Sequence, residues 1–446
     1  MDLQGKRIAI LGAGSSGYAA AALALSRGAL VEAYDSGSAE KLASAVAGFA
    51  ALGLTLTCGA EALAPAGSFD LTVISPGIDT ASPIARAFAS ASDEFIGEIE
   101  FAFRLGDAPV IAVTGTNGKT TTCSLIAAML NATGLRAVAA GNIGLPFSEV
   151  VLSGKSYDWI VLELSSFQLE TIVEFTPAVA IWLNFAPDHM DRYATVADYY
   201  AAKLRLFENL TPDSLTIHKL ECDPGGLPGK KVAFSAFSDQ GDLHYRLGSI
   251  HDQPTGRHFL FSEGTLQGKH NAENVMAALA VADSLGIAWE NVETAINTFQ
   301  APPHRCEKIA TIGGVLYLND SKSTNLHSLE SALMGQEHPV VLIAGGKNKG
   351  LDFGELRGIA GETVRAAVCI GEIARDIATA WEGAVPCQAA ADVPAAVRLA
   401  AGLARAGEVI LFSPGTSSFD MFSGYEARGD AFRAAVAALA DADAAA

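Results

Sequence analysis

The sequence predicts an α/β protein of several domains, each built around a parallel sheet, and three observations lead to this prediction. Short apolar runs alternate with helix-like stretches along most of the chain. Several of these runs end in glycine-rich or polar loops, as buried parallel strands do. The length of 446 residues suggests two to four domains, and the 50% of hydrophobic residues can fill several cores.

Composition and charge argue against several classes of protein. The net charge is −19 and no cluster of Lys and Arg occurs, so nucleic acid is not expected as a partner. The apolar runs are far shorter than the roughly 20 residues that span a bilayer. The N-terminus carries charges before any apolar run, unlike a signal peptide. The six cysteines are scattered, which fits reduced thiols. We therefore expect a cytoplasmic protein without membrane contact.

The first unit begins with a glycine-rich turn. A strand at residues 6–11 ends in Gly12-Ala-Gly14-Ser-Ser-Gly17, and a helix-like stretch follows. A second strand at residues 30–34 ends at Asp35, near the offset of about 20 residues at which an acid contacts ribose in Rossmann-type sites. Taken alone, this fingerprint indicates NAD binding, and a purely structural turn is the alternative. A third strand, residues 70–75, precedes a tight loop at Gly77.

The second unit opens with a phosphate-binding loop. The apolar run at residues 109–113 leads into Gly115-Thr-Asn-Gly-Lys-Thr-Thr121, and a helix-like stretch follows at residues 123–130. Backbone N–H groups and the helix N-terminus favour an anion there. Lys119 would reach terminal phosphates and the Thr120 hydroxyl would bind Mg²⁺. The strict pattern has glycine where Val113 stands, so a chance turn is the alternative.

Side chains suited to a metal–nucleotide site follow the next strands. Glu163 comes directly after the strand at residues 159–162, and His189 follows the strand at residues 178–182. The carboxyl ends of parallel strands share one edge of the sheet, so both are expected beside the P-loop. A histidine that caps a loop is the alternative for His189. Lys203 lies in an apolar helix, residues 198–207, where a lysine usually keeps its ammonium group in water.

The rest of the chain adds one irregular stretch and a third α/β unit. Residues from about 213 to 265 contain no chemical motif and read as irregular. A helix that opens at residues 268–274 and runs through residues 275–281 precedes a linker with Pro302 and Pro303. Strands at residues 315–318, 339–344 and 409–412 each end in a polar loop.

From these patterns alone, three classes of protein compete. They are an ATP-driven ligase or kinase, a nucleotide-gated binding module, and an NAD oxidoreductase with an incidental P-loop. A GTPase should carry Asn-Lys-x-Asp, and Asn348-Lys-Gly-Leu351 differs from it. The oxidoreductase interpretation leaves the P-loop unexplained. We therefore favour an enzyme that uses ATP or GTP and binds a second phosphorylated ligand.

Several motifs, in this order along the chain, resemble the Mur ligases. They are the P-loop, Gly141-Asn-Ile-Gly144, Glu163-Leu-Ser-Ser-Phe-Gln-Leu-Glu170, Asp188-His-Met-Asp-Arg192 and Asn319-Asp-Ser-Lys322. The stretch at residues 163–170 is similar to the members that join D-glutamate to UDP-N-acetylmuramoyl-L-alanine. Folylpolyglutamate synthases share a related P-loop but should lack that stretch. A member that takes L-glutamate stays an alternative.

The resemblance implies a fold, a reaction and partners. The domains would be a Rossmann-like N-terminal domain at residues 1–93, a central ATP-binding P-loop domain at residues 94–302 and a Rossmann-like C-terminal domain at residues 303–446. ATP would activate the alanyl carboxylate as an acyl phosphate, which the amine of D-glutamate then attacks. Mg²⁺ is implied together with ATP, and a monomer is expected. The N-terminal glycine turn would hold UDP rather than NAD.

The resemblance also implies a set of site residues. The expected catalytic residues are Lys119, Glu163, His189, Lys203 and Lys322. Mg²⁺ would be held by Thr120, Glu163, His189 and Lys203, the lysine as its carbamate. ATP would contact Gly115, Thr116, Asn117, Gly118, Lys119, Thr120, Thr121, Asn271, Asn274, Arg305 and Asp320. The UDP-substrate and the amino acid would contact Ser15, Ser16, Asp35, Ser36, Gly77, Asn142, His189, Thr324, Lys349, Ser418, Phe419 and Tyr425.

Overall fold

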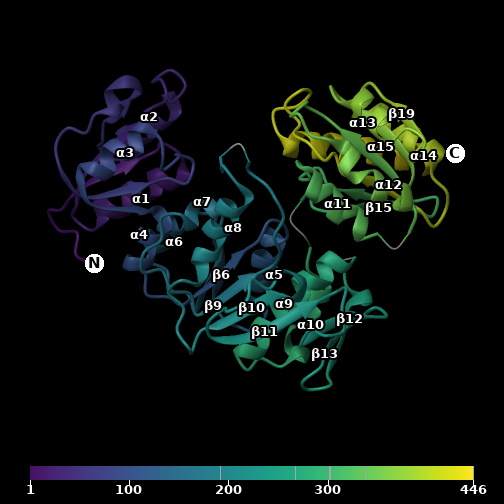
Figure 1. The fold of residues 1–446 in the computed structure, drawn as a ribbon, viewed down its shortest axis with the longest axis horizontal. Coiled ribbons are helices and arrows are strands. Elements are labelled where there is room, and N and C mark those ends of the chain that lie inside the picture. The colour runs from purple at the N-terminus through teal and green to yellow at the C-terminus, as the bar shows by residue number, and fades with distance from the viewer. Residues whose placement is uncertain (191, 267, 301–302, 337, 445–446) are drawn as a thin grey trace. The chain divides into compact units, whose positions relative to one another are not determined.

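Three sheets follow one another along the chain in the computed structural model, which describes all residues except 191, 267, 301–302, 337 and 445–446 (Figure 1). The described chain forms two compact units. The first comprises Met1–His244, His251–Arg257 and Val275–Ile296, and the second comprises Tyr245–Ile250, His258–Asn274 and Asn297–Ala446. Helices cover the sheets, which confirms the predicted α/β class. No described helix is long and apolar enough to cross a membrane.

The N-terminal sheet has the strand order β3-β2-β1-β4-β5, and all its pairs are parallel. Its strands are β1 (Arg7–Leu11), β2 (Leu30–Asp35), β3 (Leu56–Cys58), β4 (Phe69–Ile74) and β5 (Ser92–Gly97). Helices α1 (Ser15–Ser26) and α2 (Ala43–Ala51) pack on one face and α3 (Pro83–Ser90) on the other. This order is that of Rossmann-type sheets. Because β5 belongs to this sheet, the boundary expected at residue 93 falls inside a strand.

The central sheet has nine strands in the order β14-β13-β12-β11-β10-β9-β6-β8-β7. They are β6 (Val110–Thr114), β7 (Ala137–Gly141), β8 (Trp159–Glu163), β9 (Val179–Trp182), β10 (Leu215–Lys219), β11 (Lys230–Ser235), β12 (Leu243–Arg246), β13 (Ser249–Asp252) and β14 (His258–Leu260). Five of them lie in the stretch that the sequence indicated as irregular, so that interpretation was wrong. These strands are short, polar at many positions and separated by Gly, Pro and Asp, so no apolar period marks them.

Seven α-helices lie between β5 and β15 in the described chain. They are α4 (Glu98–Leu105), α5 (Lys119–Ala132), α6 (Phe147–Leu152), α7 (Ser166–Leu169), α8 (Val196–Leu204), α9 (Lys269–Ser284) and α10 (Trp289–Asn297). Capping boxes start two of them: Ser165 with Gln168 at α7, and Thr195 with Asp198 at α8. The reciprocal side-chain bonds satisfy backbone N–H groups that a helix start leaves without partners.

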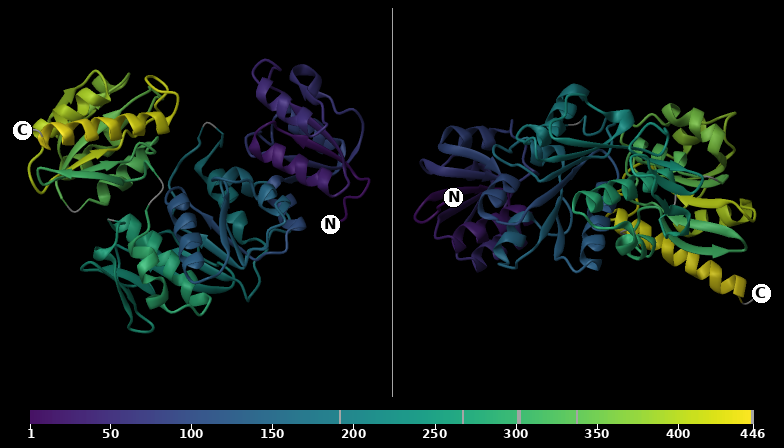
Figure 2. Two further views of the ribbon diagram at one scale, coloured as in Figure 1. Left: turned by 180° about the vertical axis from the view of Figure 1, so that it is seen from behind. Right: turned by 90° about the horizontal axis from the view of Figure 1, so that it is seen from below.

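The C-terminal sheet has the order β15-β16-β20-β17-β18-β19, with β15 antiparallel to β16. Its strands are β15 (Glu307–Ile312), β16 (Val315–Asn319), β17 (Val340–Gly345), β18 (Val364–Ile370), β19 (Cys387–Ala389) and β20 (Val409–Phe412). One face packs against α11 (Leu326–Met334), α12 (Arg357–Thr363) and α13 (Ala374–Ala380). The other packs against α14 (Val393–Leu403) and α15 (Tyr425–Ala444), the long yellow helix of Figure 2.

A buried carboxylate on α4 holds the loop that leads to β9. Glu100 is fully buried and accepts backbone N–H groups from Val173, Glu174 and Phe175 at 2.9–3.0 Å. Arg104 donates to the same carboxylate at 2.7 Å. The negative charge is thus compensated by four donors, which need both oxygens of the carboxylate.

Glu100→Gln is expected to lower the free energy of unfolding by about 2–4 kcal/mol, because an amide cannot accept from all these donors and leaves Arg104 without its buried partner. Urea unfolding followed by circular dichroism measures the change. Glu94→Gln is the matched control, because the exposed Glu94 pairs with the same arginine and should contribute less than about 1 kcal/mol. Equal losses in the two variants would contradict the expectation.

Candidate active site

The P-loop joins β6 to α5 and closely approaches the loop after β9. Gly115 and Gly118 have φ angles of 151° and 84°. A Cβ atom on Gly115 would lie 3.0 Å from the Cβ of Leu183 and 3.2 Å from the backbone of Asn184. Glycine is therefore required here both by the backbone angle and by the lack of space.

Asn184 holds this loop in place. Its Oδ1 accepts the N–H groups of Thr116 and Asn117 at 3.1 and 2.9 Å, and its Nδ2 donates to the carbonyl of Asn117 at 3.1 Å. The hydroxyl of Thr116 adds a bond to the carbonyl of Ala186. The sequence reasoning did not single out Asn184. The feature of the sequence that could have indicated Asn184 is an amide side chain directly after the apolar run that forms β9, the neighbour of the P-loop strand β6.

A carboxylate lies beside the P-loop at the end of β8. Glu163 is 3% exposed and pairs in register with Val113 of β6 and Gly141 of β7. Its Oε2 accepts the hydroxyl of Thr120 at 2.7 Å and its Oε1 accepts the amide of Asn142 at 2.8 Å. The structure thus brings together three residues that the sequence analysis had placed in the site.

The oxygen atoms of Thr120 and Glu163 fit Mg²⁺, which proteins commonly hold through one or two carboxylates together with substrate phosphates. Within the described residues no three His, Cys, Asp or Glu side chains form a ready metal cage. A metal ion here would therefore take part of its oxygen shell from a bound nucleotide and water.

Two lysines meet at the carbonyl of Gly115. Lys119 Nζ donates to it at 2.9 Å and to the carbonyl of Thr116 at 2.8 Å, and Lys203 Nζ donates to Gly115 at 2.9 Å. Lys203 is only 2% exposed and its Nζ lies 4.8 Å from the centre of the Tyr199 ring. The alternative of an ammonium group in water is therefore wrong. Burial, and then the charge of Lys119, hold the pKa of Lys203 well below its usual value.

His189 lies on the loop after β9, on the side of α8. Its φ angle is 57°, a rare conformation outside glycine that often marks functional loops. The ring lies 5.0 Å from the ring of Phe167 and 5.9 Å from that of Tyr199. Tyr199 therefore contacts both His189 and Lys203, so these two expected metal and catalytic residues lie in one region.

The predicted UDP-site residues line one hollow of about 450 Å³ in the N-terminal domain. These are Ser15, Ser16, Asp35, Ser36 and Gly77, together with Gly12. Both carboxylate oxygens of Asp35 accept backbone hydrogen bonds, one from the N–H of Ala13 and one from the N–H of Gly37, each at 2.8 Å. Its carboxylate therefore shapes the two loops that border the hollow.

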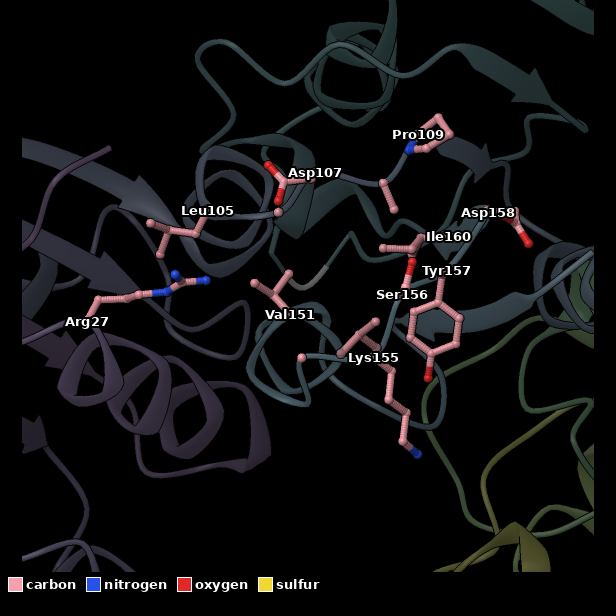
Figure 3. A pocket seen from close by; sticks show the side chains of 14 residues that line it. Arg27, Leu105, Asp107, Pro109, Val151, Lys155, Ser156, Tyr157, Asp158 and Ile160 are labelled. Carbon is pink, nitrogen blue, oxygen red and sulfur yellow. The ribbon is translucent and has the colours of Figure 1, made fainter.

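A second hollow of about 550 Å³ lies away from this site (Figure 3). Its lining includes Pro109 and Asp158, which precede β6 and β8 and so lie at the sheet edge opposite the P-loop. Figure 3 shows Arg27 on one side of it and Tyr157 on the other. Three of its charged side chains, Arg27, Asp107 and Lys155, are exposed. We do not assign it to the active site.

Three predicted residues of the C-terminal part, Arg305, Asp320 and Lys322, lie around the end of β16. Asp320 is buried, its two oxygens accept from the N–H of Cys306 and the hydroxyl of Ser413, and burial raises its pKa to about 6. Arg305 lies between two non-glycine residues with positive φ angles, and Lys322 Nζ lies 3.8 Å from the centre of the Tyr425 ring. Asn271 and Asn274 bond to each other in the first turns of α9.

The predicted amino-acid site residues follow neighbouring strands of the C-terminal sheet. Thr324 follows β16, Lys349 follows β17, and Ser418 and Phe419 follow β20. These three strands are adjacent and parallel, so their following loops share one edge. Ser418 is buried, whereas Phe419 is 65% exposed.

Arg428 ties these loops together and was not among the predicted site residues. It is fully buried and donates to the hydroxyl and carbonyl of Ser321 and to the carbonyl of Thr416 at 2.8–3.0 Å. Burial lowers its pKa to about 10. The feature of the sequence that could have indicated Arg428 is a single arginine among small and apolar residues at the start of α15.

A P-loop flanked by a buried carboxylate and a buried lysine, in a chain with three α/β sheets, defines a nucleotide-dependent multidomain enzyme. Residues 113–282 match the Mur ligase middle domain and residues 304–416 match the Mur ligase glutamate ligase domain. The chain belongs to the Mur ligase family, which confirms the predicted resemblance.

Relatives of known name match almost the whole chain. The UDP-N-acetylmuramoylalanine--D-glutamate ligase of Syntrophotalea carbinolica is 40% identical over 447 residues, with 98% of this chain and 99% of the relative covered. The ligase of the same name from Nitratidesulfovibrio vulgaris (strain DP4) is 41% identical over 436 residues, with 97% of this chain and 96% of the relative covered.

Solved structures of Mur ligases share the fold. The MurF ligase of Thermotoga maritima in complex with ADP has a TM-score of 0.60 at 16% identity, with 98% of this chain and 96% of that chain covered. UDP-N-acetylmuramate-alanine ligase MurC of the same organism has a TM-score of 0.58 at 18% identity, with 97% of this chain and 100% of that chain covered.

Proposed function

We propose that this enzyme joins D-glutamate to UDP-N-acetylmuramoyl-L-alanine with ATP, a step in the cytoplasmic synthesis of peptidoglycan precursors. The observation that carries the proposal is the identity of about 40% with ligases of this name over nearly the entire chain. The P-loop, Glu163 and the buried Lys203 supply a site that suits the reaction. We further propose that it acts as a monomer.

The reaction would proceed in two steps. An oxygen of the alanyl carboxylate attacks the γ-phosphorus of ATP, the bond to the β–γ bridging oxygen breaks, and ADP leaves. The amine of D-glutamate then attacks the acyl carbon, phosphate leaves, and one proton is released. Because two anions meet in the first step, cationic groups must supply most of the stabilisation. Lys119 is the P-loop cation, and a phosphate would replace the carbonyl groups to which it now donates.

Lys203 would act as a carbamate. Its depressed pKa makes a neutral amine available, and this amine combines with CO₂ to form a carbamate and a proton. The carbamate oxygens, with His189, would then hold one Mg²⁺, and Thr120 with Glu163 would hold another. Bound Mg²⁺ neutralises phosphate charge and, being a hard cation, prefers oxygen ligands of this kind.

The remaining predicted residues would bind the three substrates. Ser15, Ser16, Asp35, Ser36 and Gly77 would enclose UDP, supported by the hollow that they line. Asn142 would position the substrate beside Glu163, to which it donates. ATP would contact the P-loop, Asn271, Asn274, Arg305 and Asp320, with Lys322 near the transferred phosphate. Thr324, Lys349, Ser418, Phe419 and Tyr425 would bind the amino acid.

Phosphate release from ATP should require both UDP-N-acetylmuramoyl-L-alanine and D-glutamate. A coupled phosphate assay with D-glutamate, L-glutamate and meso-diaminopimelate in parallel measures the amino-acid choice. Turnover with L-glutamate instead of D-glutamate would support the variant ligase. If the protein reduces NAD with an alcohol and ignores the UDP-sugar, the ligase proposal is wrong and the glycine turn at Gly12 is an NAD site.

A further inference from the structure

Backbone hydrogen bonds link Arg192 to His189. The N–H groups of Arg192 and Tyr193 both donate to the carbonyl of His189 at 3.0 Å. The side chain of Arg192 is only 15% exposed. A displacement of Arg192 would therefore displace the loop that carries His189.

The side chain of Arg192 reaches the N-terminal domain. Its Nη2 donates to the carbonyl of Ile78 at 3.3 Å and to Oε2 of Glu170 at 3.2 Å, and its Nε lies 3.8 Å from Oδ2 of Asp79. Thr80 Oγ1 also donates to Glu170 Oε2, at 3.4 Å. Ile78 and Asp79 line the N-terminal hollow of about 450 Å³. Arg192 and Glu170 thus bind the rim of that hollow.

Aromatic contacts continue from Arg192 to the P-loop. The guanidinium carbon lies 4.4 Å from the centre of the Phe167 ring, which also packs against the rings of His189 and Tyr193. The hydroxyl of Tyr193 donates to Glu170 at 2.6 Å. Its ring packs against Tyr199, whose hydroxyl lies 3.4 Å from the hydroxyl of Thr116 in the P-loop. A continuous set of contacts therefore joins the hollow to the phosphate-binding loop.

We propose that Arg192 and Glu170 are positioning residues that couple occupancy of the N-terminal hollow to the placement of His189. This proposal rests on the proposed function, because it takes the UDP-substrate as the occupant of the hollow. Both bonds of Arg192 come from one nitrogen, Nη2, and the bond to Glu170 is charge-assisted, which makes it stronger than a neutral hydrogen bond. We call Arg192, Glu170 and their bonds to residues 78–80 the clamp. A substrate that occupies the hollow contacts this segment, and the clamp passes that contact on to the loop of His189.

The test compares four variants with the wild-type enzyme: Arg192→Ala, Arg192→Lys, Glu170→Gln and the double variant Arg192→Ala/Glu170→Gln. The control is Arg27→Ala, since this exposed arginine of the same unit forms no side-chain bond within the described structure. Steady-state kinetics gives kcat and KM for each substrate, and thermal unfolding confirms that each variant is folded. Arg192→Lys keeps the positive charge but loses the guanidinium group. If Arg192→Ala does not fold, the kinetics of Arg192→Lys are compared with wild type instead.

Arg192→Ala should raise KM for the UDP-substrate about 10- to 100-fold and lower kcat about tenfold, with KM for ATP almost unchanged, because charged hydrogen bonds typically contribute this much. Arg192→Lys should recover part of the loss, and the double variant should lose no more than the worse single variant. Arg27→Ala should match wild type.

The proposed coupling is wrong if the losses of Arg192→Ala and Glu170→Gln add up in the double variant, or if Arg192→Ala has the same kinetics as Arg27→Ala. Either result would leave the ligase proposal intact. A wild-type enzyme that does not turn over UDP-N-acetylmuramoyl-L-alanine would instead overturn the proposed function, and the clamp with it. A lower melting temperature with unchanged KM and kcat would identify the pair as structural only.

Discussion

Lys203→Ala is expected to lower turnover by about 10²–10³-fold while the protein stays folded, because removal of one group that stabilises transition-state charge typically has an effect of this size. The fold should tolerate the change. Alanine is the most favourable residue for the helix α8, and the carbonyl of Gly115 keeps a donor in Lys119.

Formate or acetate should restore part of the activity of Lys203→Ala, since a small carboxylate can take the place of the lost carbamate oxygens. A phosphate-release assay over a series of carboxylate concentrations measures this rescue. Lys119→Ala is the matched control, because a carboxylate cannot replace its cation and no rescue is expected. Near wild-type turnover of Lys203→Ala in CO₂-depleted buffer would show that no carbamate is needed.

Glu163→Gln is expected to lower kcat by about 10²–10³-fold and to raise the Mg²⁺ concentration needed for half-maximal activity about 10- to 100-fold. Glutamine has nearly the same shape, so the loss follows from the missing charge at the side chain that contacts Thr120 and Asn142. Mg²⁺ titrations of activity and of nucleotide binding, the latter by calorimetry without turnover, measure the two effects separately.

Asp158→Asn is the control for Glu163→Gln, because Asp158 precedes the amino end of the same strand and lies outside the site. It should keep wild-type turnover and metal dependence. An unchanged Mg²⁺ requirement in Glu163→Gln would remove this residue from the proposed metal site, even if its turnover falls.

Local chemistry explains why much of the site could be found from the sequence. Gly115 to Thr121 form a continuous motif whose function depends on their own backbone, and Glu163 is placed by the strand that precedes it. The order of apolar runs likewise predicted β1, β6, β8, β9 and β17, because strands covered on both faces are apolar throughout.

Contacts between distant segments explain what could not be found. Asn184 and Arg428 act on backbone groups of other segments, and Glu100 accepts from a loop more than 70 residues away. The strands of residues 213–265 also escaped prediction, because sheet pairing defines them rather than an apolar period.

The sequence by itself determined the α/β class, the P-loop and the family, because each depends on residue types at short spacing. Only the tertiary structure decided whether the Lys203 side chain is buried. The sequence placed it on a helix, where its amine could lie in water or inside the protein. The carbonyl of Gly115 and the ring of Tyr199 enclose it, and Lys119 lies nearby, so burial and like charge favour the neutral amine.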